Sequence, residues 1–413
     1  MMRHPEAWIV MAMAALGLHP SMAPGQGAGG RVGTHVILKD PSTRLMVGKQ
    51  VAATEDIHRV YTIERVSGPW LWIVASGVTG KVGSTRTGVS GWVKAVDVVP
   101  FDQAIDHFSG VVRRKPGAWA YCLRGMAWYD EKEYDIALRD FNEAIRLDPK
   151  YAAARNNRGL VRREMGEPDK ALADFNEAIR LDPKNAIAYN NRGLVWHDKK
   201  EPDKALADFN EAIRLDPRYA NAYINRGNVW RRKRDHDRAI ADYNEAIRLD
   251  PKLVRAYWFR GATCLLQACD GAAASARSCL DVNGWRHELS PYMSLVGHLG
   301  HRQMHRDSEA RQILDEAATK CDTSAWPYPI IRYLRHEIGE KELCAPIDDN
   351  DVDKMTVART HIGLDHSLSG RPEQALLHLH WVEEHGRRDG IEYELALAEI
   401  DRIEGRKAVA SRP

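Results

Sequence analysis

The nine residues FNEAIRLDP at positions 141–149 recur along the chain with almost no change, at 175–183, 209–217 and, with Tyr in the first place, 243–251. The prolines that end these copies are spaced 34 residues apart. A period of this length is typical of stacked helix–turn–helix units, each of which buries its apolar face against its neighbours. We therefore predict that the chain is mainly α and forms an α-solenoid.

Each unit repeats the features that two packed helices need. A small residue recurs where a side chain would keep the two helices apart. Small and large apolar residues then follow at helical spacing, as in Ala171, Phe175 and Ala178, which predicts the buried stripe of a second helix. Because proline disfavours a helical residue before it and donates no hydrogen bond, Leu-Asp-Pro ends that helix. The small residues are Gly125, Gly159, Gly193, Gly227 and Gly261.

This order of Gly, Ala, Phe, Ala and Pro resembles the tetratricopeptide repeat (TPR) family. The resemblance covers four repeats in residues 118–253, and a fifth begins at Tyr257. It implies a right-handed TPR α-solenoid at 118–262, whose first helices line a concave groove that binds proteins. One subgroup of the family clamps a C-terminal carboxylate with Lys and Asn. That ligand is not favoured here, because the Lys is absent and the matching positions are only Asn157, Asn191 and Asn225.

The residues that line the groove can be predicted from helical spacing. They fall at offsets i, i+3, i+7 and i+10 on each first helix, counted from residues 119, 153, 187, 221 and 255. Asn side chains there could bind the backbone of an extended peptide, or they could bind one another between repeats and hold the stack together. The candidate partner-binding residues are Asn156, Arg163, Asn190, His197, Asn228, Arg231 and Trp258.

Arginine precedes each repeat glycine, where the family prefers leucine. These side chains either pair with an Asp of the second helix or bind a ligand, and we expect the ion pairs. The second repeat also carries Arg155 and Arg162 where other copies have aromatic residues, so its local packing should be the weakest. The Asp candidates are Asp140, Asp174, Asp208 and Asp242.

Composition and the N-terminus indicate an exported protein of several modules. The 413 residues are 44% hydrophobic and 28% charged, and a net charge of +2 argues against nucleic acid as a partner. Residues 1–28 are predicted to be a signal peptide, because basic residues precede a short apolar run and a Pro/Gly/Ala-rich stretch. No segment is predicted to span a membrane. We expect the protein in the periplasm or cell envelope of a bacterium; an apolar tail on a cytoplasmic protein is the alternative.

Residues 31–100 consist of short β-rich runs separated by Gly, Ser and Asp-Pro, which predicts a small β-barrel. Trp70 and Trp72, together with Gly91-Trp92-Val93, resemble bacterial SH3-like domains. The resemblance implies binding to cell-wall peptides or to another protein. We expect Trp72 to face the core and the loop from Thr79 to Ser90 to offer a contact surface.

The remaining modules are predicted to be helical. Residues 101–117 should link the barrel to the solenoid, 263–345 should form divergent hairpins, and 346–405 a divergent TPR hairpin with a capping helix. The last part resembles the C-terminal region of bacterial envelope TPR adaptor lipoproteins. A lipid anchor on an N-terminal cysteine is not expected, because no cysteine precedes Cys122.

No set of residues predicts catalysis, a metal site or a cofactor. His301 and His305 have the spacing of a zinc-binding pair, but Arg302 stands where a metalloprotease needs Glu. The histidines His298, His378, His380 and His385 suggest no further site. There is no phosphate-binding glycine loop after a strand and no GxSxG motif. Disulfides remain an open question for three neighbouring cysteines, Cys264, Cys269 and Cys279.

The function predicted from the sequence is that of a non-enzymatic, exported scaffold, which binds a protein or peptide through the TPR groove. The alternative is a cell-wall protein that binds peptidoglycan through the SH3-like domain. Neither hypothesis names the partner, because repeat folds accept unrelated ligands.

Overall fold

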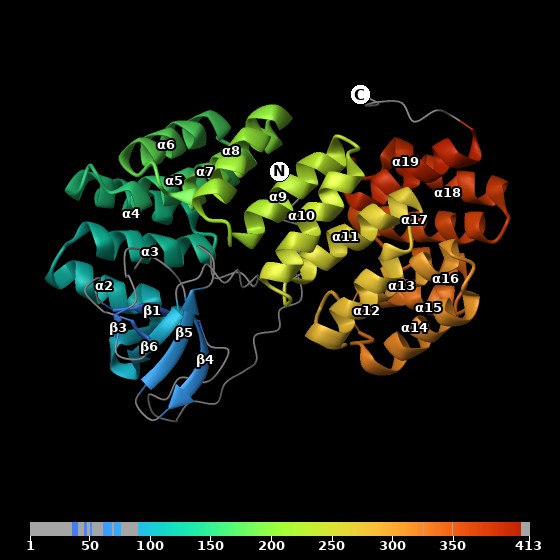
Figure 1. Cartoon of the computed structure of the whole chain (residues 1–413), viewed down its shortest axis with the longest axis horizontal. Coiled ribbons are helices and arrows are strands. Elements are labelled where there is room, and N and C mark those ends of the chain that lie inside the picture. Colours follow the sequence, from blue (N-terminus) through green and yellow to red (C-terminus); the bar gives the residue numbers. More distant parts are fainter. Residues whose placement is uncertain are drawn as a thin grey trace. The chain divides into compact units, whose positions relative to one another are not determined.

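The computed structural model describes residues 35–39, 45–47, 50–51, 61–67, 70–75, 90–324, 326–348 and 350–405. These residues are mainly helical, as predicted, and contain helices α2 to α19 and one β-sheet (Figure 1). The described residues up to Val229, together with Arg248–Leu253, form one compact unit. Trp230–Ile247 and the residues from Val254 onward form a second unit. The predicted signal peptide, 1–28, lies outside the described residues.

The sheet of the first unit is antiparallel throughout, with the strand order β3-β2-β6-β5-β4-β1-β7. Its edge strands β3 and β7 have only two and three residues and do not pair with each other within the described residues. The described strands therefore form an open sheet and not the predicted closed barrel. The strands are β1 (His35–Leu38), β2 (Met46–Val47), β3 (Gln50–Val51), β4 (Tyr61–Ser67), β5 (Trp70–Ala75), β6 (Ser90–Lys94) and β7 (Val98–Pro100).

One face of the sheet forms its core. Leu71 and Ile73 of β5 are buried on this face with Ile63 of β4. Because successive side chains of a strand point to opposite faces, Trp70 and Trp72 lie on the other one. Trp72 is half-buried there and Trp70 is exposed, so the expectation that Trp72 faces the core is wrong. Most of the predicted contact loop, residues 79–89, lies outside the described residues.

The predicted linking helix is present as α2 (Ala104–Arg114), preceded by a short 3₁₀ helix, η2 (Phe101–Gln103). Phe108 of α2 is completely buried in one cluster with Ile37 of β1 and Val99 of β7. The same cluster continues to Leu123 of the first repeat. The sheet and the first repeat therefore share a hydrophobic core, with α2 between them.

The repeats form helical hairpins. Within the first unit, each first helix packs against the second helix of its own repeat, and α5 also contacts the first helices α3 and α7 on either side. Pro168 and Pro202 occupy the first position of their helices, where a missing N–H costs little. The helices are α3 (Ala118–Asp130), α4 (Tyr134–Leu147), α5 (Ala152–Glu164), α6 (Pro168–Leu181), α7 (Ala186–Asp198), α8 (Pro202–Leu215), α9 (Ala220–Arg232) and α10 (His236–Leu249).

The repeat glycines lie where two helices are closest. A Cβ atom on Gly159 would lie 2.8 Å from the ring of Phe175, and one on Gly193 would lie 2.7 Å from Phe209. Both rings are completely buried. The glycine therefore makes room for the large residue of the apolar stripe, as the spacing predicted.

The expected ion pairs join the two helices of a hairpin. Arg124 binds Asp140 at 2.7 Å, and further pairs of 2.6 Å join Arg158 to Asp174 and Arg192 to Asp208. In the second repeat, Arg162 adds a contact of 2.8 Å to Asp174, in the place where Trp196 stands in the third repeat. The second repeat thus uses a second ion pair where its neighbour has an aromatic ring.

The second unit also consists of hairpins. Helix α13 packs against α14, and α17 packs against α18. Ala375, Leu379 and Val382 of α18 are buried in one cluster with Ala396 and Ile400 of α19. The helices are α11 (Val254–Gln267), α12 (Gly271–Asn283), α13 (Ser290–Gln303), α14 (Asp307–Lys320), α15 (Tyr328–Leu334), α16 (Glu340–Cys344), α17 (Val352–Leu368), α18 (Pro372–His385) and α19 (Ile391–Ile403).

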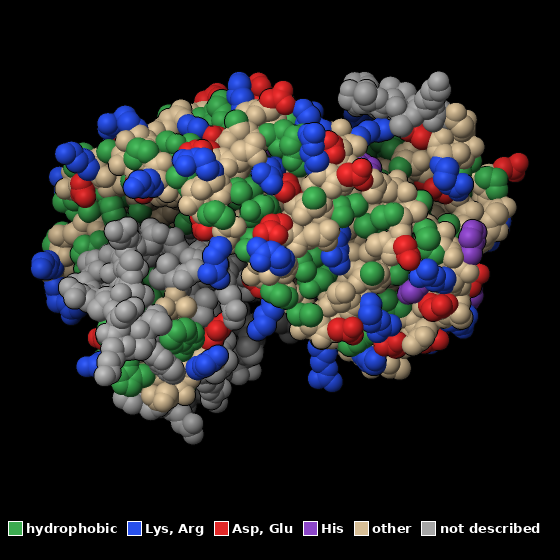
Figure 2. Space-filling model, viewed as in Figure 1, with side chains coloured by type: hydrophobic (Ala, Val, Ile, Leu, Met, Phe, Trp, Pro, Cys, Tyr) green, Lys and Arg blue, Asp and Glu red, His purple; other side chains and the backbone are tan. Residues whose placement is uncertain are grey.

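Two surface properties bear on possible partners. None of the described helices combines the length and the apolar character that crossing a membrane requires. On the face that Figure 2 shows, acidic and basic side chains are interspersed and form no extended basic surface. This distribution agrees with the small net charge of +2 and does not favour nucleic acid.

Candidate functional site

The first helices of the repeats carry the predicted site. We use the term inner face for the predicted positions on α3, α5, α7, α9 and α11. Trp258 is half-buried. The other six candidate residues are buried: Asn156, Arg163, Asn190, His197, Asn228 and Arg231.

Buried asparagines of consecutive repeats form a ladder of side-chain hydrogen bonds. The Asn225 amide donates to the Asn190 Oδ1 at 2.9 Å, and the Asn191 amide donates to the Asn156 Oδ1 at 3.1 Å. Within a helix, Asn190 donates to Asn191 at 3.4 Å and Asn156 donates to Asn157 at 3.2 Å. The ladder ends where the Asn157 amide meets the Sγ of Cys122 at 3.6 Å.

The amide ladder decides between the two roles that the sequence left open for Asn156 and Asn190. Buried amides without a partner are costly, and here each of the two amides has partners in the protein itself. The geometry therefore favours the role of holding α5, α7 and α9 in register. Asn157, Asn191 and Asn225, which occupy one position of the carboxylate-clamp pattern, belong to the same ladder.

Arg163 and His197 occupy equivalent positions on α5 and α7. The Nε of Arg163 donates to Asp198 Oδ2 at 2.6 Å, so that an ion pair joins two consecutive first helices. His197 lies beside the same carboxylate, with its Nδ1 at 3.9 Å from Asp198 Oδ1. The Nε2 of His197 is buried without a hydrogen-bond partner in the described part of the chain. Among the candidate residues, the hydrogen-bonding capacity of this atom and of Arg231 Nε is unused within the described part of the chain.

In the second unit, the chain itself covers the inner face. Arg231, at the end of α9, forms an ion pair with Glu394 of α19 and lies over the ring of Phe259 at 5.9 Å. Trp258 packs edge to face on Tyr292 of α13, with 5.6 Å between the ring centroids. The positions of Arg231 and Trp258 are therefore engaged by the chain's own helices.

Apolar side chains remain partly open on the inner face of the first unit. Leu160 of α5 and the two α7 residues Ile187 and Leu194 are half-buried. They belong to neighbouring first helices in contact. This partly exposed apolar row differs from the saturated amide ladder, since its side chains still have surface to bury.

His298 and the cysteines singled out in the sequence take structural positions. His298 is buried with its Nδ1 at 2.9 Å from the Ala310 carbonyl oxygen, and burial lowers its pKa to about 4. Among the described residues, no cluster of three metal-ligating atoms includes His301 or His305. All six cysteines are described and none is disulfide-bonded. Burial raises the pKa of Cys264 and of Cys279 to about 12, so both are neutral thiols at pH 7.

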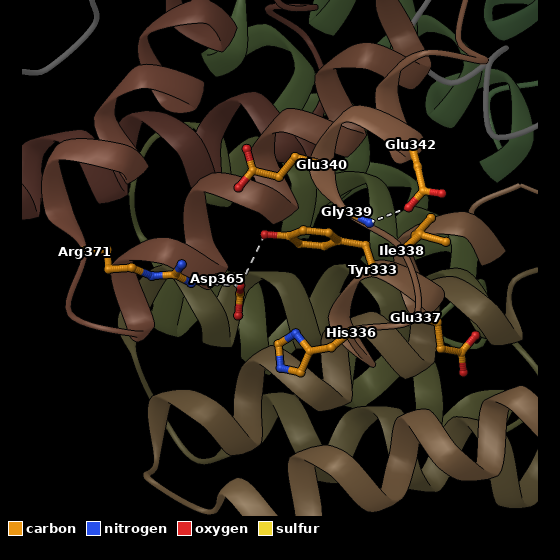
Figure 3. Close-up of a pocket in the computed structure, with 9 residues that line it drawn as sticks. All are labelled: Tyr333, His336, Glu337, Ile338, Gly339, Glu340, Glu342, Asp365 and Arg371. Carbon is orange, nitrogen blue, oxygen red and sulfur yellow. Dashed lines mark hydrogen bonds and ion pairs between the residues drawn. The ribbon is translucent and has the colours of Figure 1, made fainter.

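A pocket of about 410 Å³ in the second unit was not predicted from the sequence (Figure 3). The Tyr333 hydroxyl points toward Asp365 and donates to its Oδ2 at 3.3 Å, while Arg371 lies 3.6 Å from the same oxygen. Glu340 extends along another side of the pocket. Because the lining residues come from α15, α16, α17 and the segments that follow α15 and α17, no local motif could reveal the pocket.

Comparison with known families identifies the repeats. The family model described as tetratricopeptide repeat matches residues 122–186, 156–220 and 201–254. These matches cover the hairpins from α3 to α10. They include neither the N-terminal sheet nor the helices from α12 onward, so the resemblances predicted for those regions stay predictions. No curated protein matches the sequence.

Solved structures with similar folds include MamA, with 26% identity, coverage of 38% of this chain and 92% of that chain, and a TM-score of 0.35. YrrB, described as a TPR protein with an unusual peptide-binding site, has 20% identity, coverage of 45% and 96%, and a TM-score of 0.35. A tetratricopeptide repeat protein from Parabacteroides merdae has 16% identity, coverage of 72% and 99%, and a TM-score of 0.43. With TM-scores below 0.5, these structures identify no partner for this chain. Residues 122–254 are tetratricopeptide repeats, a repeat type that typically forms non-enzymatic scaffolds for protein–protein interaction.

Proposed function

We propose that this protein is a non-enzymatic scaffold, which binds an extended segment of a partner protein along the inner face of its first unit. The partly exposed apolar row of Leu160, Ile187 and Leu194 is the observation that carries the proposal. Burying such side chains against a partner is favourable, and a few well-packed residues carry most of the binding energy of an interface. The proposed ligand is therefore a peptide segment with apolar side chains.

In this proposal the candidate residues fall into three groups. Asn156, Asn190 and Arg163 hold the first helices in register through the amide ladder and the pair with Asp198. Asn228 and His197 are buried at inner-face positions of α9 and α7. Arg231 and Trp258 belong to the second unit, where α19 and α13 contact them. Binding by these two residues would require the contacts with α19 and α13 to open.

A photo-crosslinking amino acid tests the proposed face directly. Placed at Leu194 in cells that express the full chain, it should give one discrete crosslinked product. Placed at Lys184, which is exposed on the loop before α7, it should not give that product. The product from Leu194 should disappear when Leu160 is replaced by Asp and circular dichroism shows intact helices. Equal products from both positions, or a product that survives Leu160→Asp, would reject the inner face as the binding surface.

We further propose that the protein acts in the bacterial envelope after export. The apolar run between Trp8 and Leu18 and the resemblance of the C-terminal part to envelope adaptor proteins support this location. Fractionation of cells that express the full chain should recover it outside the cytoplasm, in a form shortened at its N-terminus. Recovery of the uncut chain in the cytoplasm would contradict export.

The alternative function, binding of peptidoglycan through the N-terminal sheet, has one observation in its favour. Trp70 is 37% exposed, and the Lys94 ammonium lies 5.7 Å from the centre of its ring. Exposed aromatic residues commonly serve as contacts in recognition. If the alternative is right, the full chain should sediment with purified peptidoglycan and Trp70→Ala should release it, while Val96→Ala, at another exposed position, should not. Absence of sedimentation would remove the alternative.

A further inference from the structure

Three side chains that are distant in the sequence meet in the second unit. Glu340 begins α16, His366 lies in the last turn of α17, and His378 lies in the middle of α18. The Nε2 of His366 is 2.6 Å from Glu340 Oε1, and the Nε2 of His378 is 3.2 Å from Glu340 Oε2. The two imidazole rings are stacked, with 5.7 Å between centroids. Both histidines therefore direct the same nitrogen toward one carboxylate.

Close packing holds the two histidines in place. A Cβ atom on Gly363, one turn before His366, would lie 2.5 Å from Leu379, the residue after His378. Helices α17 and α18 are thus as close at this point as a glycine allows. On the other side, Leu343 of α16 is buried in one cluster with Ile362 of α17. The packing of three helices, and not a flexible loop, brings the three side chains together.

In each of the two rings, one nitrogen has a polar partner and the other has none within the described residues. His366 and His378 are both buried, and the Nδ1 atom of each has no hydrogen-bond partner within the described residues. A cation bound between these atoms would take the Nε2 lone pair of each neutral ring and one oxygen of the carboxylate, while the proton of each ring would lie on Nδ1. It would also balance the negative charge of Glu340.

The donor set and its dimensions fit a transition metal. Two imidazole nitrogens and one carboxylate oxygen are ligands that Zn²⁺ accepts, at bond lengths of about 2.0–2.2 Å. Such bonds place neighbouring ligand atoms of a tetrahedron roughly 3.3 Å apart. The three ligand atoms here already lie within 4.8 Å of one another. Small side-chain movements would therefore complete the geometry.

The cluster also leaves room for a further ligand. Glu340 lines the pocket of about 410 Å³ (Figure 3). The two imidazoles are buried and are not among the residues that line the pocket. Asp365 belongs to the same pocket but already accepts hydrogen bonds from Tyr333 and Arg302, each at 3.3 Å. A fourth metal ligand would thus come from the pocket as water or as an anionic group, with Arg371 nearby.

We propose that Glu340, His366 and His378 form a site for one divalent transition metal ion, best suited to Zn²⁺, with an open position toward the pocket. The sequence contained no signal of it, because the ligands are separated by 26 and 12 residues and belong to three helices. The proposal is independent of the scaffold function, since the inner face of the first unit shares no residue with this site.

Isothermal titration of the untagged full chain, first treated with a chelator, tests the proposal with Zn²⁺ as the probe. The wild type should bind one Zn²⁺ per chain, and Co²⁺ in its place should give the strong visible absorption of a tetrahedral complex. Loss of a group that merely supports a metal ligand weakens binding by 10- to 100-fold, so losing a ligand should weaken it at least about 100-fold. We expect this loss for His366→Gln, His378→Gln and Glu340→Gln.

The matched control is His380→Gln. His380 is on the same helix as His378, but its ring contacts Glu383 and Glu404 instead of the cluster. This variant should bind Zn²⁺ as the wild type does. Circular dichroism identifies any variant that fails to fold. The three single variants His366→Gln, His378→Gln and Glu340→Gln test the site independently of one another. Absence of stoichiometric Zn²⁺ binding by the wild type, or undiminished binding by folded His366→Gln and His378→Gln, would overturn the proposal.

Discussion

Single residues of the repeat have exact steric roles, and the pair of Gly159 and Phe175 illustrates them. The ring of Phe175 fills the space that a side chain at position 159 would occupy. Cores packed at this density respond to the addition of one methyl group. Gly110 of α2 provides the contrast, because a Cβ atom there would meet only the end of Arg114 at 3.9 Å.

We predict opposite effects of alanine at these two glycines. Gly159→Ala should lower the free energy of unfolding by about 1–2 kcal/mol, because the overpacking cost exceeds the gain in helix propensity. Gly110→Ala should raise it by about 0.5–1 kcal/mol, since only the propensity changes. Urea unfolding followed by circular dichroism measures both. If Gly159→Ala is as stable as Gly110→Ala, the helices are not in tight contact at the repeat glycine.

Asp174 is the residue on which two arginines of the second repeat depend. Its buried carboxylate accepts two hydrogen bonds from Arg158, at 2.6 Å on Oδ1 and 2.9 Å on Oδ2. Arg162 donates a third, at 2.8 Å, to Oδ2. Asp174→Asn should lower the free energy of unfolding by about 2–4 kcal/mol, because both guanidinium groups lose their charged partner. The control Glu177→Gln, at an exposed pair with Arg180, should have little effect on the melting temperature. A small effect of Asp174→Asn would mean that the ion pairs only line the surface.

At the scale of elements, helices α13 and α17 carry buried histidines, among them His298 and His361. Burial lowers the pKa of His298 to about 4 and that of His361 to about 3, whereas the value is 6.5 without burial. The unfolded chain therefore binds more protons than the folded one between pH 6.5 and about 3. The contribution of these residues to stability is complete above pH 6.5 and is lost progressively as the pH falls below it.

We therefore predict that the second unit becomes less stable from pH 6.5 downward, by several kcal/mol in order of magnitude before pH 4 is reached. Urea unfolding at pH 7, 5.5 and 4.5 measures the change. His298→Gln combined with His361→Gln should flatten the pH dependence, whereas His385→Gln, an exposed position, should leave it unaltered. An unchanged slope in the double variant would assign the pH dependence to other groups.

Most helices could be predicted because their residues recur. The spacing of Gly159, Phe175 and Pro183 predicted where two helices pack and where one ends. The role of Asn190 could not be decided, because an amide on the inner face suits both a peptide and the next repeat, and only the distance to Asn225 separates them. Glu340, His366 and His378 escaped prediction, since their meeting depends on the packing of three helices and not on a local spacing.

At the scale of the whole molecule, the two compact units contain different stabilising pairs. Asp174 and its arginines belong to the first unit, and the pair of Arg231 and Glu394 belongs to the second. A buried arginine that loses its partner destabilises mainly the structure around it. The effects of removing the two carboxylates should therefore be separable within one chain.

Hydrogen–deuterium exchange with mass spectrometry measures this separation. Asp174→Asn should speed exchange in α5 and α6 and leave α17 and α19 unchanged. Glu394→Gln should speed exchange in α19 and the end of α9 and leave α5 unchanged. If either variant speeds exchange throughout the described helices, the two units unfold as one.

The amide ladder has a consequence for the number of repeats. Residues 168–181 and 202–215 are identical in sequence. Each hydrogen bond of the ladder that joins two helices links residues 35 apart. A tandem duplication of residues 168–201 therefore keeps the sequence at both ends of the insert and every hydrogen bond of the ladder. The lengthened chain should still fold cooperatively with increased helicity, as circular dichroism and thermal melting would show; loss of the cooperative transition would contradict this. Copy number is then a property that recombination between near-identical stretches can change without disturbing the rest of the stack.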